Sequence, residues 1–168
     1  MTDTLTESVP NEVEDLAETV LKAACERDLK LVTAESCTGG LLASLLTDVT
    51  GASYAFERGF VTYTNQAKHE MLGVGADILD APGPVSEVVA QAMAQGALER
   101  SDGDLALSIT GFAGPGGPGD EEGRVHFALA RKDGPMLHRE EHFGARGRGP
   151  LRIAALKTAL EMLDEALR

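Results

Sequence analysis

Apolar side chains recur along this chain at helical spacing and at strand spacing in turn. Between residues 11 and 27 they fall three and four positions apart, which is typical of an amphipathic helix, and Asn11 followed by Glu14 indicates a capping box. Short apolar or alternating runs predict strands. The predicted helices are about 11–27, about 39–48, a short one capped by Asn65, one capped by Ser86, and a last one with Pro150 in its first turn. The predicted strands are about 30–34, 59–64, 104–110, 124–131 and 136–143, and residues 73–85 are expected to form a loop.

The order of these elements predicts an α/β fold. Strands separated by helices pair in parallel, whereas the two strands around residues 132–135 form an antiparallel hairpin. We therefore expect a mixed sheet with helices on both faces. No repeat or linker divides residues 11–168, so we expect one domain there, and we expect residues 1–10 to be a disordered tail.

Charge and composition narrow the class of function. The net charge of −12 argues against a nucleic-acid or acidic-membrane partner, because phosphate contacts need clustered Lys and Arg, but a local pocket for a small anion stays compatible with it. No apolar run approaches the roughly 20 residues of a membrane span, and the start of the chain lacks a signal-peptide pattern. Two cysteines, Cys25 and Cys37, make no disulfide framework, so we expect a reducing, cytoplasmic location.

The segment Ala34-Glu35-Ser36-Cys37-Thr38-Gly39-Gly40 is the strongest candidate for chemistry. It lies between a predicted strand and a predicted helix, so its turn presents side chains at the carboxyl edge of the sheet, beside helix N–H groups that can bind developing negative charge. Ser36, Cys37 and Thr38 are candidate nucleophiles or hydrogen-bond donors. Because Ser36 and Cys37 are adjacent, we expect only one of them to face a pocket, and a small buried cysteine is the commoner state.

A nucleophilic serine needs a base, and the chain offers two kinds. The four histidines (His69, His126, His138 and His142) have no Asp or Asn partner at a suggestive spacing and no zinc spacing, so we expect them to be exposed or to line strands, and we expect no metal. The other candidate is Lys68, held neutral by burial, with Tyr63 relaying a proton or donating to an oxyanion. From spacing alone a solvated surface lysine is favoured by roughly three to one, and Tyr63 alone would be a tyrosine at the edge of the core.

Two further segments could bind an anion. The glycine-rich loop after Thr110, which includes Gly111 and Gly114, could cradle a phosphate with its N–H groups, although it matches neither a P-loop nor a dinucleotide fingerprint; a flexible connector is the alternative. Arg146, Arg148 and Arg152 precede or begin the last helix. They could clamp an anion, or they could be a solvated helix start.

Taken together, four motifs resemble the CinA C-terminal domain family, in the expected order over about residues 11–168. They are Ala34 to Gly40, Tyr63-Thr64-Asn65-Gln66-Ala67-Lys68, Val85-Ser86-Glu87, and Thr110-Gly111-Phe112-Ala113-Gly114-Pro115-Gly116-Gly117. The resemblance implies a three-layer α/β/α sandwich with a mixed, mostly parallel sheet. It also implies deamidation of nicotinamide mononucleotide (NMN) to nicotinate mononucleotide and ammonia, with no metal or other cofactor, in a homodimer or larger oligomer.

The resemblance also implies roles for individual residues. Ser36 would be the nucleophile, Lys68 its base and Tyr63 a polar helper. The remaining residues would bind the substrate: Cys37, Thr38 and Gly39 at the turn, Thr110, Gly111 and Gly114 at the loop, and Arg148 and Arg152 near the phosphate.

The chain departs from the family pattern at two places, and two alternative functions stay open. The stretch 118–124 is short and acidic, and Gly147-Arg148 stands where the family usually has Asp-Arg. The chain lacks the larger N-terminal domain of full-length CinA proteins, so we expect a stand-alone form. One alternative is a nucleotide-binding module without turnover, serving DNA uptake or a stress response; the other is a hydrolase for a different nucleotide amide.

Overall fold

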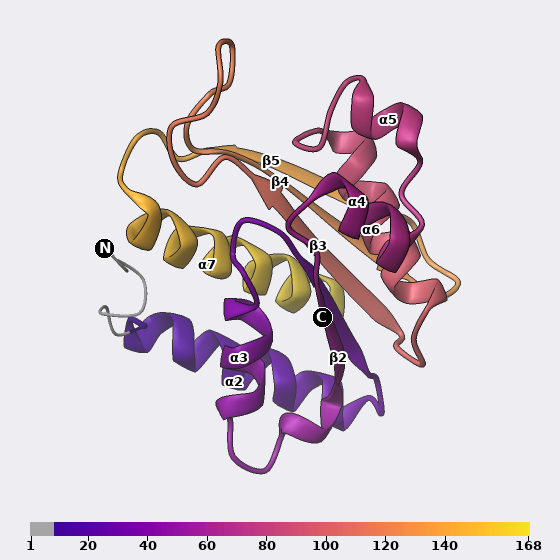
Figure 1. Ribbon diagram of the computed structural model, residues 1–168. Helices are drawn as coiled ribbons and strands as arrows, with labels where there is room; N and C mark the ends of the chain where they lie inside the picture. Colours follow the sequence, from indigo (N-terminus) through magenta and orange to yellow (C-terminus); the bar gives the residue numbers. More distant parts are fainter. Residues whose placement is uncertain (1–8) are drawn as a thin grey trace.

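A five-stranded mixed sheet lies at the centre of the computed structural model, which describes residues 9–168 (Figure 1). The strand order is β2-β1-β3-β4-β5. The bounds are β1 Leu31–Glu35, β2 Phe56–Val61, β3 Leu105–Gly111, β4 Arg124–Arg131 and β5 Leu137–His142. Strand β1 pairs in parallel with β2 and β3, whereas β4 is antiparallel to both β3 and β5, so β4 alone runs against the others. The expected α/β fold with a mixed, mostly parallel sheet is confirmed.

Helices cover both faces of this sheet and complete the three layers (Figure 1). One face packs against α2 (Asn11–Glu26), α3 (Leu41–Asp48) and α7 (Arg148–Leu167), and the other against α4 (Asn65–Leu72), α5 (Ala76–Asp80) and α6 (Glu87–Glu99). Alternate residues of β3 and β4 serve the two layers. Leu107 and Phe127 face the α2–α7 layer, while Ala106 and Ala128 face α6, where small side chains allow close packing.

Three local expectations were wrong: two concern the residue that caps a helix, and the third missed a short helix. Asn11 is the first residue of α2 rather than its cap, since Pro10 occupies the N-cap without a side-chain bond, and no capping box forms. The cap of α4 is Thr64, whose hydroxyl accepts from the N–H of Ala67, so Asn65 is already helical. The predicted loop at residues 73–85 contains the short helix α5. The cap at Ser86 and the hairpin are confirmed.

Strand β2 lies earlier in the chain than the expected 59–64. It occupies the edge of the sheet, so its burial pattern is irregular and the hydrophobic alternation that sets register is weak. Residues 62–64 instead leave the strand and turn into α4. This shift brings the start of α4 to the carboxyl end of β1.

Of the expected tail, residues 1–8 lie outside the described part of the chain. Val9 packs partly against the core, and Pro10 is the N-cap of α2. None of the helices within residues 9–168 is long and apolar enough to cross a membrane.

Candidate active site

Ser36 lies directly after β1, in the middle of the sheet edge where β1 and β3 end. Its N–H donates to the carbonyl of Ile109 on β3 (3.0 Å), and its own carbonyl accepts from the N–H of Gly39 (3.1 Å). The turn closes through Gly39 and Gly40, at φ 62° and 94°, a left-handed backbone that glycine adopts without strain. The side chain of Ser36 is 7% exposed. The sequence thus presents this hydroxyl at the strand–helix turn, as expected.

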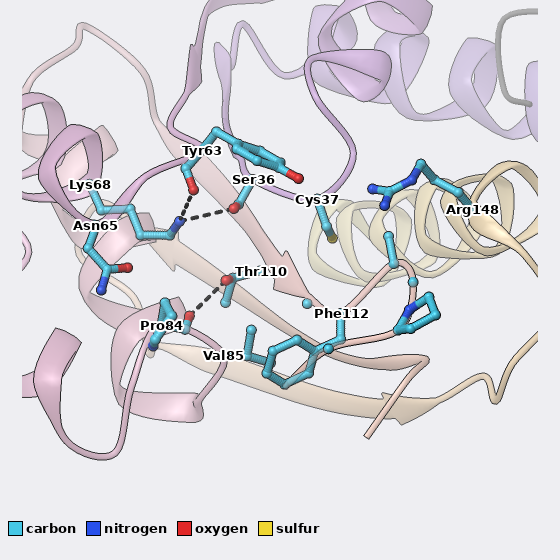
Figure 2. A pocket seen from close by; sticks show the side chains of 15 residues that line it. Ser36, Cys37, Tyr63, Asn65, Lys68, Pro84, Val85, Thr110, Phe112 and Arg148 are labelled. Atoms are coloured by element: carbon cyan, nitrogen blue, oxygen red, sulfur yellow. Dashed lines mark hydrogen bonds between the residues drawn. The ribbon is translucent and has the colours of Figure 1, made fainter. Parts of the chain in front are cut away.

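Lys68, in α4, is the polar group that meets Ser36. Its Nζ lies 3.0 Å from Ser36 Oγ, and it donates to the carbonyls of Thr62 (3.1 Å) and Tyr63 (3.3 Å), as Figure 2 shows for Ser36 and Tyr63. Lys68 is 2% exposed, so the alternative of a solvated surface lysine is wrong. Burial lowers the pKa of Lys68, and among the described residues no carboxylate contributes to that shift.

The three neighbours of Lys68 Nζ favour an amine that can act as a base. The carbonyls of Thr62 and Tyr63 can only accept, whereas the Ser36 hydroxyl can donate or accept. A neutral amine has two N–H bonds and one lone pair. With its two N–H groups on the carbonyls, its lone pair is left for the hydroxyl proton of Ser36.

Ser36 and Lys68 open into a cavity of about 230 Å³ between the turn, the start of α4, the segment before α6 and the glycine-rich loop. Tyr63 lines it at the mouth, with its side chain 66% exposed, and Figure 2 shows its ring beside Ser36 with the hydroxyl pointing toward Cys37. The backbone carbonyl of Tyr63, rather than its hydroxyl, contacts Lys68. Asn65 lines the cavity from the first turn of α4.

Cys37 also lines the cavity, so the expectation that only one of the two neighbours would face it was wrong. Burial raises the pKa of Cys37 to about 12, and the charge of Arg152 opposes that shift only in part. The group is therefore a thiol near neutral pH. Because the thiolate is the reactive form of cysteine, this burial disfavours Cys37 as a nucleophile.

Thr38 and Gly39 belong to the turn but do not line the cavity. The Thr38 hydroxyl donates to the carboxylate of Glu35, and the Gly39 N–H is taken by the Ser36 carbonyl. The N–H groups at the start of α3 were expected to bind developing negative charge, but those of Leu42 and Ala43 donate to Glu35 instead. A carboxylate of the chain itself therefore occupies the donors that we expected a ligand to use.

The glycine-rich loop forms the far wall of the cavity. Thr110, Gly111 and Gly114 all line it, and the Thr110 hydroxyl donates to the carbonyl of Pro84 (2.8 Å), which ties the loop to the segment before α6. A Cβ at Gly111 would lie 2.7 Å from Val125 Cγ2, so packing against β4 requires glycine there. Phe112 adds an aromatic wall, with the Arg124 guanidinium 5.6 Å from its ring centre.

The three arginines near the last helix have different surroundings. Arg148 lines the cavity, and Figure 2 shows it opposite Lys68. A Cβ at Gly114 would lie 3.1 Å from Arg148 Nη2, so the glycine makes room for this guanidinium. Arg152 lies behind the turn, where its Nε donates to the Cys37 carbonyl (2.9 Å), and Arg146 donates to the Phe143 carbonyl.

None of the four histidines lines the cavity, and each has a partner elsewhere. His126 Nδ1 lies 3.0 Å from His138 Nε2, His69 contacts the Val74 carbonyl, and His142 contacts Glu121. Burial lowers the pKa of His126. Within residues 9–168 no group of three or more His, Cys, Asp or Glu is arranged to hold a metal ion.

Comparison with known proteins agrees with this architecture. The sequence model described as the CinA C-terminal domain matches residues 13–167. The chain belongs to the CinA C-terminal domain family. The crystal structure of the competence/damage inducible protein CihA from Agrobacterium tumefaciens superposes with a TM-score of 0.91 at 46% identity, covering 96% of this chain and 99% of that one.

Members of the CinA family differ in length. The nicotinamide-nucleotide amidohydrolase PncC of Escherichia coli K12 is 44% identical over 155 residues, which are 91% of this chain and 93% of that protein. A CinA-like protein of Akkermansia muciniphila is 46% identical over 155 residues, which are 91% of this chain but 37% of that protein. This chain spans between 30% and 38% of three such longer relatives.

Sequence reasoning gave no role to several residues of the site. Glu35 lay inside the quoted motif, but its neighbours offered the more obvious hydroxyl and thiol. The cavity is also lined by Pro84, Val85 and Asn65, none of which has a nucleophilic, basic or charged side chain. Val85 and Asn65 lie inside two of the motifs that resemble the family, and Pro84 directly precedes one of them.

Proposed function

We propose that this chain hydrolyses the carboxamide of NMN to nicotinate mononucleotide and ammonia, with Ser36 as nucleophile and Lys68 as its base. The observation that carries the proposal is the 3.0 Å contact between Lys68 Nζ and Ser36 Oγ inside a cavity. This chain matches the E. coli nicotinamide-nucleotide amidohydrolase over nearly the whole length of both proteins, and the name of that relative supports NMN as the substrate.

The first step follows from the protonation state of Lys68. The neutral amine takes the hydroxyl proton as Ser36 Oγ forms a bond to the amide carbon, which gives a tetrahedral oxyanion and a Lys68 ammonium. The carbonyls of Thr62 and Tyr63 hold the ammonium in place by accepting hydrogen bonds from two of its three N–H groups. The third proton points back toward the reaction centre.

Collapse of the tetrahedral intermediate breaks the bond from carbon to nitrogen. The Lys68 ammonium gives its proton to the leaving nitrogen, so ammonia departs and an ester to Ser36 remains. The backbone N–H of Cys37 is the candidate donor to the oxyanion, because Cys37 lines the cavity, whereas Thr38 does not and the Gly39 N–H already donates to the Ser36 carbonyl. Such a donor contributes on the order of 3 kcal/mol to the transition state in well-studied hydrolases.

The second half returns the enzyme to its starting state. Water attacks the ester carbon while Lys68 accepts a proton from it, and the proton then passes to Ser36 Oγ as the carbon–oxygen bond to Ser36 breaks. The products are the original serine and amine and a carboxylic acid, which loses its proton to solvent or to the released ammonia. No oxidant, reductant or other group takes part in this balance.

Binding of the rest of the substrate is assigned to the far wall. Arg148 and the N–H groups of the loop around Gly114 would hold the 5′-phosphate, and Phe112 or Tyr63 would face the pyridine ring. Binding energy from the phosphate then positions the amide at Ser36. An assembly of two or more chains and a cytoplasmic location stay predictions.

A direct assay of the purified chain tests the proposal. Ammonia and nicotinate mononucleotide are measured with NMN for the wild type, for Ser36→Ala and for Lys68→Met, with Ser44→Ala and Lys22→Met as exposed controls. The proposal requires turnover in the wild type and both controls, and a loss on the order of 1000-fold or more in Ser36→Ala. NMN binding without ammonia release by the wild type would instead support a nucleotide-binding module.

A further inference from the structure

Glu35 is a buried carboxylate next to the nucleophile that the proposed reaction does not use. It ends β1, immediately before Ser36, and is 0% exposed. Burying a charge is costly unless hydrogen bonds replace its water, so the position calls for a physical explanation. Among the residues described, no Lys or Arg forms an ion pair with it; its partners are neutral donors of the turn and of α3.

Three donors from the same turn and helix hold the carboxylate. Oε1 accepts from Thr38 Oγ1 (2.6 Å) and from the N–H of Leu42 (2.9 Å), and Oε2 accepts from the N–H of Ala43 (3.0 Å). Leu42 and Ala43 are in the first turn of α3, where the helix dipole also favours a negative charge. The carboxylate thereby bonds the middle of the turn that carries Ser36 and Cys37 and the start of the helix that follows it.

Helix α3 has no cap of its own, which explains why this contact is needed. Its N-cap is Gly40, which has no side chain, and both Gly39 and Gly40 adopt left-handed backbone. Two consecutive glycines leave the turn with much conformational freedom in the absence of other constraints. Glu35 supplies the missing cap from the preceding strand and fixes the helix relative to that strand.

The main chain of Glu35 reaches the base as well. Its carbonyl accepts from the N–H of Thr62 (2.8 Å), and the carbonyl of Thr62 accepts from Lys68 Nζ (3.1 Å). One residue therefore holds the turn of the nucleophile by its side chain and the support of the base by its backbone.

We infer that Glu35 is a positioning residue that holds Ser36 Oγ at bonding distance from Lys68 Nζ, with Thr38 as its hydroxyl partner. This inference rests on the proposed function of Ser36 and Lys68. Glu35 does not line the cavity, so it acts through the turn and not by contact with substrate. Thr38, which the family resemblance placed at the substrate, belongs to the same support.

Glu35→Gln is the sharpest variant because it preserves shape. A glutamine can accept from Thr38 and Leu42 through its one oxygen, but its NH₂ then faces the Ala43 N–H, donor against donor. We expect kcat for NMN to fall by about 100-fold with KM within about threefold, as for a small misplacement of reacting groups. Glu18→Gln, on the exposed face of α2, is the matched control and should leave both constants unchanged.

Substitutions at Thr38 test the same contact from its other side. They leave the buried carboxylate in place, so their effect on folding is independent of that of Glu35→Gln. Thr38→Val removes the hydroxyl at equal size, and Thr38→Ser keeps it. We expect Thr38→Val to lower kcat by about 10-fold and Thr38→Ser to restore it, because the donor to Glu35 is what matters. If Glu35→Gln fails to fold, this pair carries the test.

The outcomes separate this inference from the proposed function. If the wild type is active and folded Glu35→Gln has an undiminished kcat, the role of Glu35 is overturned while the proposed function stands. Equal activity of Thr38→Val and Thr38→Ser has the same consequence. A KM that rises as much as kcat falls would make it a binding residue instead. If the wild type releases no ammonia, crystal structures of the wild type and Glu35→Gln still decide: the inference requires the Ser36–Lys68 contact to lengthen beyond 3.5 Å in the variant, and an unchanged contact refutes it.

Discussion

Lys68 Nζ lies 3.0 Å from Ser36 Oγ, although 32 positions separate the two residues in the chain. The contact depends on parallel pairing of β1 with β2, which brings the residues after both strands to one edge of the sheet. Thr64 then caps α4 and turns it so that Lys68 lies over the edge. Two unremarkable side chains thus acquire a shared, poorly solvated environment in which an amine and an alcohol can exchange a proton.

The rate should rise with pH as Lys68 loses its proton. Burial lowers the pKa of Lys68 below its usual 10.5, and only the neutral amine can accept the proton of Ser36. We expect kcat/KM for NMN to increase with pH and to level off at an apparent pKa below 10.5. Steady-state assays from pH 5 to 10 measure this limb.

Substitution at Lys68 checks that this limb belongs to the lysine. Lys68→Arg keeps a permanent charge and removes the base, so we expect a loss of about 100- to 10,000-fold at every pH and no rising limb. Lys22→Met should retain the wild-type profile. A rising limb with the same midpoint in Lys68→Arg would assign the titration to another group.

The sequence predicted the layers of this fold because the decisive patterns are local. The apolar run of buried β3 and the helical spacing of apolar residues in α2 and α6 can be read from short stretches of sequence. The turn before β5 contains Asp133-Gly134, a dipeptide typical of hairpins. Strand β2 was displaced because an edge strand needs no strict alternation, and α5 is too short to show a period. Both misses lie next to the site, where the chain departs from regular structure.

The site itself divides in the same way. Ser36 could be proposed from one segment, since the strand, the turn and the helix are contiguous. The burial of Lys68 could not, because it arises from the pairing of β1 with β2 and the direction of α4. The absence of Thr38 and Arg152 from the cavity lining likewise depends on their partners, the Glu35 carboxylate and the Cys37 carbonyl.

Cys37 should be dispensable for turnover. Burial raises the pKa of Cys37 to about 12, so the group is a thiol and not a thiolate at pH 8. We expect Cys37→Ala to keep kcat for NMN within about fivefold of the wild type, with a loss of about 1 kcal/mol in the free energy of unfolding from the small cavity. Chemical denaturation and steady-state assays measure the two quantities.

Cys25 provides the control for the chemistry of this thiol. Both cysteines are free, and Cys25 is only partly buried. At pH 8 iodoacetamide should therefore modify Cys25 first, as followed by mass spectrometry of the peptides, and activity should persist after that first event. Rapid inactivation with label on Cys37, together with an active Ser36→Ala, would make the thiol the nucleophile.

Arg148 should contribute to binding of the substrate phosphate, and a substrate without phosphate isolates that contribution. Its guanidinium lines the cavity opposite Lys68, beside Gly114. Loss of a charged hydrogen bond weakens binding by about 10- to 100-fold, so Arg148→Ala should raise KM for NMN by that factor and leave KM for nicotinamide riboside unchanged. Arg146→Ala is the matched control, because Arg146 bonds the Phe143 carbonyl away from the cavity. An equal rise in KM for both substrates in Arg148→Ala would show that Arg148 supports the loop and not the phosphate, and an effect confined to Arg146→Ala would move the phosphate site to the other side of the helix start.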